Sequence, residues 1–82
     1  MNYYKCEGHR KIQAENMRDA AEIFASIKAN RLGKNGRVAT LRADSWTRDN
    51  SWVQYQAFIG VYSHKEQVMT GENQWFEVKL CQ

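Results

Sequence analysis

The spacing of apolar residues changes abruptly along this chain of 82 residues, and this change is what most constrains its fold. From Met17 to Ile27 apolar side chains recur at intervals of three and four residues, which is the spacing of one helical face. Beyond residue 36 the interval becomes two, which is typical of strands with one buried face. The chain is therefore expected to combine one amphipathic helix with a sheet.

The helix is predicted to span residues 17–31. Asn16 is a suitable N-cap, and Gly33 can adopt the left-handed conformation that ends many helices. The apolar stripe comprises Met17, Ala20, Ala21, Phe24 and Ile27, with Ile23 on its flank. From this stripe, Ala20, Phe24 and Ile27 are expected to pack against the sheet.

Two strands are predicted at residues 37–47 and 52–63, where apolar and polar side chains alternate. The turn residues Arg48-Asp49-Asn50-Ser51 separate them and favour antiparallel pairing. A third strand is predicted at residues 75–81. Residues 64–73 are polar and irregular, although residues 67–70 could briefly extend the sheet.

The N-terminal segment, residues 3–14, is expected to be extended, with Gly8 near its middle. Gly8 could be a bulge in one long strand or the bend of a short hairpin, and the sequence is compatible with both. The predicted order is β-α-β-β-β. This order favours an α+β fold of two layers, with one amphipathic helix on a mainly antiparallel sheet and a single domain over residues 1–82.

One face of such a sheet has no cover, because the chain supplies only one helix. Alternation places Leu41, Tyr55, Ile59, Phe76, Val78 and Leu80 toward the helix. The residues then predicted on the uncovered face are Arg42, Trp46, Gln54, Gln56, Phe58, Trp75 and Lys79. Aromatic rings and cations of this kind suit a protein interface or the stacking of nucleobases. They are equally compatible with cross-strand pairs that only stabilise a solvated sheet.

A second candidate surface is basic. Four cations without an intervening acid lie at the end of the helix and in the loop after it: Lys28, Arg31, Lys34 and Arg37. We call these four residues the basic loop. It could contact a polyanion or an acidic protein, or it could only stabilise the negative end of the helix dipole.

Motifs for catalysis or metal binding are absent from the sequence. There is no phosphate-binding glycine loop, no Cys-x-x-Cys pair and no His-Glu-x-x-His motif. A zinc site built from Cys6, His9, His64 and Cys81 is conceivable, but it lacks the paired spacing of zinc modules. We therefore expect two free thiols, no metal, no cofactor and no enzymatic activity.

The expected location is the cytoplasm. Residues 1–10 contain no apolar segment of the signal-peptide kind, and no stretch is apolar enough to cross a membrane. Two cysteines are too few for a disulfide framework. We therefore expect no membrane association.

In size and layout, the chain resembles small accessory proteins of phages and mobile elements, including some anti-CRISPR inhibitors. The resemblance covers the general plan and the passage from strand into helix at Ile12-Gln13-Ala14-Glu15-Asn16-Met17-Arg18-Asp19-Ala20-Ala21. It carries no diagnostic motif, so it assigns no role to any residue. It implies an inhibitor that acts on another protein.

The function expected first is therefore a non-catalytic binding module that occupies a surface on a protein or ribonucleoprotein complex. This module would inhibit a host defence complex that handles nucleic acid. The alternative is a small basic domain that binds nucleic acid directly, through the aromatic sheet face or the basic loop. Whether the chain is a monomer or a homodimer is left open by the sequence.

Overall fold

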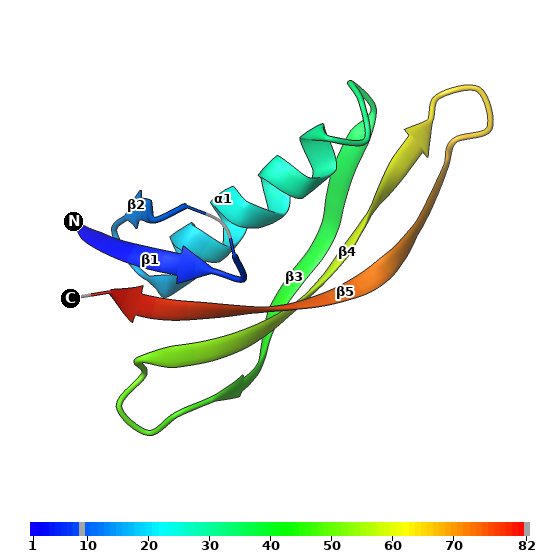
Figure 1. The fold of residues 1–82 in the computed structure, drawn as a ribbon. Helices are drawn as coiled ribbons and strands as arrows, with labels where there is room; N and C mark the ends of the chain where they lie inside the picture. The colour runs from blue at the N-terminus through cyan, green and yellow to red at the C-terminus, as the bar shows by residue number, and fades with distance from the viewer. Residues whose placement is uncertain (9, 82) are drawn as a thin grey trace.

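A computed structural model describes residues 1–8 and 10–81 and contains one helix packed on a five-stranded antiparallel sheet (Figure 1). The elements are β1 (Asn2–Cys6), β2 (Ile12–Ala14), α1 (Met17–Asn30), β3 (Gly36–Trp46), β4 (Trp52–Ser63) and β5 (Val68–Cys81). This arrangement confirms the predicted α+β fold of one helix layer on one sheet. The additional strand arises because the N-terminal segment divides in two.

The N-terminal segment is a hairpin and not one bulged strand. Strands β1 and β2 are antiparallel, with Tyr4 opposite Ile12. The chain reverses after β1, where Glu7 and Gly8 have positive φ angles of 32° and 79°. The left-handed region favours glycine, so Gly8 is suited to the bend.

The strand order in the sheet is β2-β1-β5-β4-β3. Strand β1 lies beside the C-terminal end of β5, with Cys6 opposite Val78 and Tyr3 opposite Cys81. The two ends of the described chain are therefore neighbours (Figure 1).

Strand β5 is about twice as long as predicted. It pairs with β4 without interruption from Val68, opposite Ser63, to Lys79, opposite Trp52. Residues 71–73, predicted to be irregular, are therefore in the sheet. Their own β-propensity is low, but a continuous partner strand satisfies their backbone groups.

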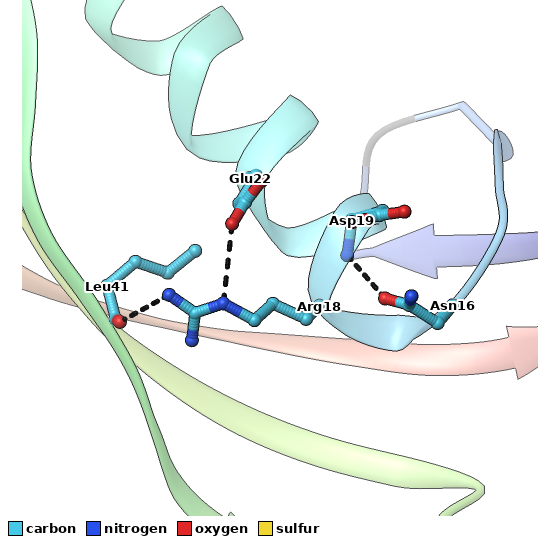
Figure 2. A network of polar contacts seen from close by, with 5 residues as sticks. All are labelled: Asn16, Arg18, Asp19, Glu22 and Leu41. Carbon is cyan, nitrogen blue, oxygen red and sulfur yellow. Dashed lines mark hydrogen bonds and ion pairs between the residues drawn. The ribbon is translucent and has the colours of Figure 1, made fainter.

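The helix begins at the predicted cap. The Oδ1 atom of Asn16 accepts a hydrogen bond of 2.9 Å from the backbone N–H of Asp19 (Figure 2). The helix ends at Asn30, one residue before the predicted end, and Gly33 has a φ of 109°. Both termini therefore follow from local signals in the sequence.

Arg18 joins the first turn of α1 to β3. Its Nη2 atom donates a hydrogen bond of 3.1 Å to the carbonyl oxygen of Leu41, and its Nε atom lies 3.3 Å from Oε1 of Glu22 (Figure 2). Both partners of the ion pair are exposed, so its energy is small. The contact positions the helix over β3 rather than stabilising the fold strongly.

The core lies between α1 and the sheet. Phe24 meets Phe76 edge to face, with ring centroids 4.9 Å apart, and Tyr55 stacks on Phe76 with ring centroids 6.1 Å apart. The helix side of the core is otherwise made of alanines: Ala20, Ala21, Ala25 and Ala29. Ile27, predicted to be in the core, is only half-buried, because the buried stripe turns toward Ala25 and Ala29.

Two irregularities in β3 change which face its side chains occupy. The pairing of β3 with β4 shifts between Val38 and Thr40, and again between Ala43 and Ser45. After the second shift Trp46 lies opposite Val53, which is buried on the helix side. The prediction that Trp46 lies on the uncovered face is therefore wrong, because an extra residue in a strand reverses the alternation.

Candidate binding surface on the open face of the sheet

The face of the sheet opposite α1 carries six of the seven residues predicted for it. We call it the open face. The register of the strands places on it Arg42, Gln54, Gln56, Phe58, Trp75 and Lys79. The same face also carries residues that were not among the predicted contact residues, including Lys5, Trp52 and Glu77. The open face is therefore a continuous surface that extends over β1, β5, β4 and β3.

The centre of the open face is a row formed by Trp75, Gln56 and Arg42 on three adjacent strands. The Nε atom of Arg42 donates a hydrogen bond of 2.8 Å to Oε1 of Gln56. Trp75 lies on the part of β5 that β1 does not cover, and its side chain is 48% exposed. The row therefore presents an oriented guanidinium and an exposed indole, the side chains most often found at the energetic centres of interfaces.

A second row on the open face contains Lys5, Lys79 and Trp52. Lys5 lies directly opposite Lys79, and like charges in this position repel each other. The carboxylate of Glu77 offsets the repulsion only partly, because its Oε2 atom is 3.9 Å from Nζ of Lys79. Alternation within one strand does not reveal this pair, because it depends on which strand becomes the neighbour of β5.

The basic loop has structural partners of its own. The Nη1 atom of Arg37 donates hydrogen bonds to the carbonyl oxygens of Lys34 (3.0 Å) and Gly36 (3.1 Å). The Nζ atom of Lys28 lies 5.3 Å from the centre of the Phe24 ring. Two of the four cations therefore have contacts within the chain, although neither of them donates to a carbonyl oxygen of the last helical turn.

Glu7 is close to the basic loop in space, although the sequence around the loop contains no acid. Glu7 and Gly8 line a small hollow together with Lys28 and Arg31. The hairpin of β1 and β2 brings the carboxylate there. The cationic character of the basic loop is therefore weaker than the sequence suggests.

Three of the four residues considered for a zinc site are described, and they do not come together. Cys6 and Cys81 are at the end of the sheet formed by the chain termini, whereas His64 is in the turn between β4 and β5, beside Tyr62. His9 lies outside the described residues. Within residues 1–8 and 10–81, no three side chains of His, Cys, Asp or Glu are grouped as metal ligands.

The two cysteines are free and lie on opposite faces of the sheet. Cys6 is fully buried beneath α1, and burial raises the pKa of its thiol to about 11. Cys81 is partly exposed and lies opposite Tyr3 on the open face.

We expect a thiol reagent such as Ellman's reagent to label one cysteine of the native protein quickly, and this cysteine is Cys81. Cys6 should react only after unfolding, because the reacting species is the thiolate and the native Cys6 thiol stays protonated above pH 9. Since the unfolded thiol ionises at lower pH than the native one, this group makes folding less favourable as the pH rises from about 9 to 11. The Cys81→Ser variant is the control, and rapid labelling of that variant would contradict the burial of Cys6.

A groove of about 650 Å³ lies between β2 and α1, away from the open face. Ile23 and Ile27 form part of its apolar surface, and Glu15, Asp19 and Glu22 are along its length. These carboxylates make the groove acidic, whereas the open face is mainly basic. The sequence signal for the groove is Ile23, on the flank of the apolar stripe, next to Ile27 at its end.

No family model, curated protein or solved structure matches this chain. Within the described residues, no helix is both long enough and apolar enough to cross a membrane.

Proposed function

We propose that this protein is a non-catalytic module that binds a protein or ribonucleoprotein complex through the open face of its sheet. The observation that carries this proposal is the row of Trp75, Gln56 and Arg42 at the centre of that face. The indole of Trp75 and the guanidinium of Arg42, which is oriented by its hydrogen bond to Gln56, offer both apolar area and hydrogen-bond donors.

The open face is favoured over the basic loop for a physical reason. Arg37 already donates to two carbonyl oxygens, and Lys28 already contacts an aromatic ring. A partner at the basic loop would have to compete with these contacts. A partner on the open face would cover Trp75 and the half-buried Trp52 and Phe58 without breaking any contact of the core.

The mode of action that we propose is occlusion. A small domain that covers about 800 Å² of a partner can block access to that surface without performing any chemistry. The cations of the open face, Lys5, Arg42 and Lys79, favour a partner surface that is acidic or that normally holds nucleic acid. A host complex that handles nucleic acid has such surfaces, and it is the target that the resemblance to phage accessory proteins implies.

A specific feature favours a second candidate function, which is direct binding of single-stranded nucleic acid. The opposed pair Lys5 and Lys79, with Trp52 beside it, could receive a phosphate between the ammonium groups and a base on the indole. A bound phosphate would remove the repulsion between the two lysines.

Two tryptophans provide a matched test of the proposed surface. Trp75→Ala should weaken partner binding by about 2 kcal/mol, roughly thirtyfold, because it removes the centre of the interface. Trp46→Ala should leave binding unchanged, because Trp46 is 62% exposed but lies on the other face. The measurement is quantitative pulldown from lysate with both variants, together with gel shifts on single- and double-stranded DNA and RNA.

The outcomes separate the candidates. Captured proteins that are lost with Trp75→Ala and kept with Trp46→Ala support protein binding. A single-stranded oligonucleotide that shifts with a steep salt dependence, reduced in Lys79→Gln, supports the second candidate. Loss of all binding when Lys34 and Arg37 are neutralised, with both tryptophan variants binding normally, would assign the function to the basic loop instead.

A further inference from the structure

Strand β5 has a long edge that no other strand covers. Strand β1 pairs only with residues 78–81 of β5, so residues 68–77 have a neighbour on the β4 side alone, as far as the chain is described. Figure 1 shows this part of β5, in orange, projecting beyond the end of β1. The uncovered edge is ten residues long.

The backbone groups along this edge can be assigned from one hydrogen bond. The N–H of Leu80 donates to the carbonyl oxygen of Ser51, on the β4 side of β5. In an antiparallel strand the residues that point to one neighbour alternate with those that point to the other. The odd-numbered residues therefore direct their N–H and C=O groups to the empty side: Met69, Gly71, Asn73, Trp75 and Glu77.

The other two edges of the sheet are protected against pairing, and this one is not. Strand β2 has only three residues, and β3 has two register shifts and carries Arg37, Arg42 and Asp44. Bulges, charges and short length are the usual devices that keep an edge from adding another strand. From Val68 to Glu77, β5 has no register shift and no proline, and its only charged residues are Glu72 and Glu77.

We propose that two copies of this chain associate through the free edge of β5 and form one continuous sheet of ten strands. The two copies of β5 are antiparallel and related by a two-fold axis, so that the same edge serves both subunits. Each copy supplies the outward-pointing backbone groups that the other lacks. A second copy fits this edge because the two free edges are identical. Both have ten residues, and both end where β1 begins to pair with β5.

The axis passes through Asn73. This register pairs residues 69–77 of both copies. If the second copy were shifted toward the C-terminus of β5, it would overlap β1. A register centred on Glu72 would place two carboxylates directly opposite each other, which is unfavourable. With Asn73 opposite its own equivalent, Glu72 faces the amide of Gln74 in the second copy.

The same register gives Trp75 a partner. Trp75 faces Gly71 of the second copy, where no side chain occupies the surface and an indole can cover the exposed backbone. The dimer would therefore join the open faces of the two subunits into one surface, with a tryptophan on each side of the axis. The proposal does not depend on the identity of the ligand of the open face.

Sedimentation velocity and light scattering on the full chain test the dimer. The wild-type protein should have twice the mass of the 9.6 kDa chain, and Asn73→Lys should have the mass of one chain, because it places two ammonium groups at the axis. Asn73 is exposed, so the substitution should leave the circular dichroism spectrum and melting temperature nearly unchanged. Asn73→Ala is the matched control and should remain dimeric. A wild-type protein that stays monomeric at every concentration would overturn the proposal, whether or not its open face binds a partner.

Cysteine crosslinking tests the register. In a Cys81→Ser background, Asn73→Cys should form a disulfide-linked dimer on mild oxidation, because residues opposite each other in a hydrogen-bonded pair have Cα atoms about 5.5 Å apart. Met69→Cys should not, since each Met69 is eight residues from its equivalent, about 26 Å along the strand. Equal crosslinking of the two variants, or dimers that form only through Met69→Cys, would contradict the proposed pairing.

Discussion

Replacing Phe24 by alanine is expected to lower the free energy of unfolding by about 3–5 kcal/mol. Phe24 is the only large side chain among the buried helix positions of the described chain, and only 6% of its surface is exposed. Its ring meets Phe76 edge to face at 4.9 Å. The surrounding helix positions are alanines, which cannot move into the space that the ring leaves. A small domain has about 5–10 kcal/mol of stability in total, so the loss is a large share of it.

Urea unfolding followed by tryptophan fluorescence measures this loss. Ile23→Ala is the control on the same helix, because Ile23 is 40% exposed and lies outside the core. We expect its effect to be below about 1 kcal/mol. A Phe24→Ala variant as stable as Ile23→Ala would show that α1 does not pack on the sheet through this face.

Replacing Gly60 by alanine is expected to cost about 3 kcal/mol, because β4 and β5 approach each other too closely for a side chain there. A Cβ atom at Gly60 would lie 2.3 Å from the carbonyl oxygen of Thr70 and 2.6 Å from Cα of Gly71. Both of these atoms belong to the backbone of a paired strand, so the strain cannot be relieved by rotating a side chain. The pairing of Gly60 with Gly71 is therefore a structural requirement of the hairpin.

Gly8→Ala is the matched control for this substitution. Gly8 has a φ of 79° but open space around it, so alanine there should cost only the backbone strain of about 1 kcal/mol. Thermal unfolding of both variants gives the comparison. Gly60→Ala that melts at the wild-type temperature would mean that the two strands are farther apart than the structure has them.

The helix and the main hairpin could be predicted because their signals are local. Asn16 caps the helix through a neighbour three residues away, and Gly33 follows the helix end with the positive φ that favours glycine. The turn between β3 and β4 is held by Asp49, which accepts hydrogen bonds from the hydroxyl and backbone N–H groups of Ser51 and from the hydroxyl group of Thr47, and these bonds lower the pKa of its carboxyl. Interactions within a few residues can be recognised without knowing the rest of the fold.

The candidate binding surface could be predicted only where a strand is regular. Strands β4 and β5 alternate without a shift, and all five predicted residues on them are on the open face: Gln54, Gln56, Phe58, Trp75 and Lys79. In β3, which has two shifts, Arg42 was placed correctly and Trp46 was not. A bulge has no reliable sequence signal here, because Ala39 and Asp44, which interrupt the pairing, are not glycines.

The sequence by itself determined the class of the fold, the position of the helix and the hydrophobic alternation that separates the covered face from the open one. These follow from periodicity and from local capping, which depend on residues close together in the chain. Only the tertiary structure decided that β1 lies beside β5, that Lys5 therefore lies opposite Lys79, and that residues 68–77 of β5 have a free edge. The physical reason is that strand neighbours are chosen by long-range packing under the helix, where Cys6, Val78 and Phe76 share one core.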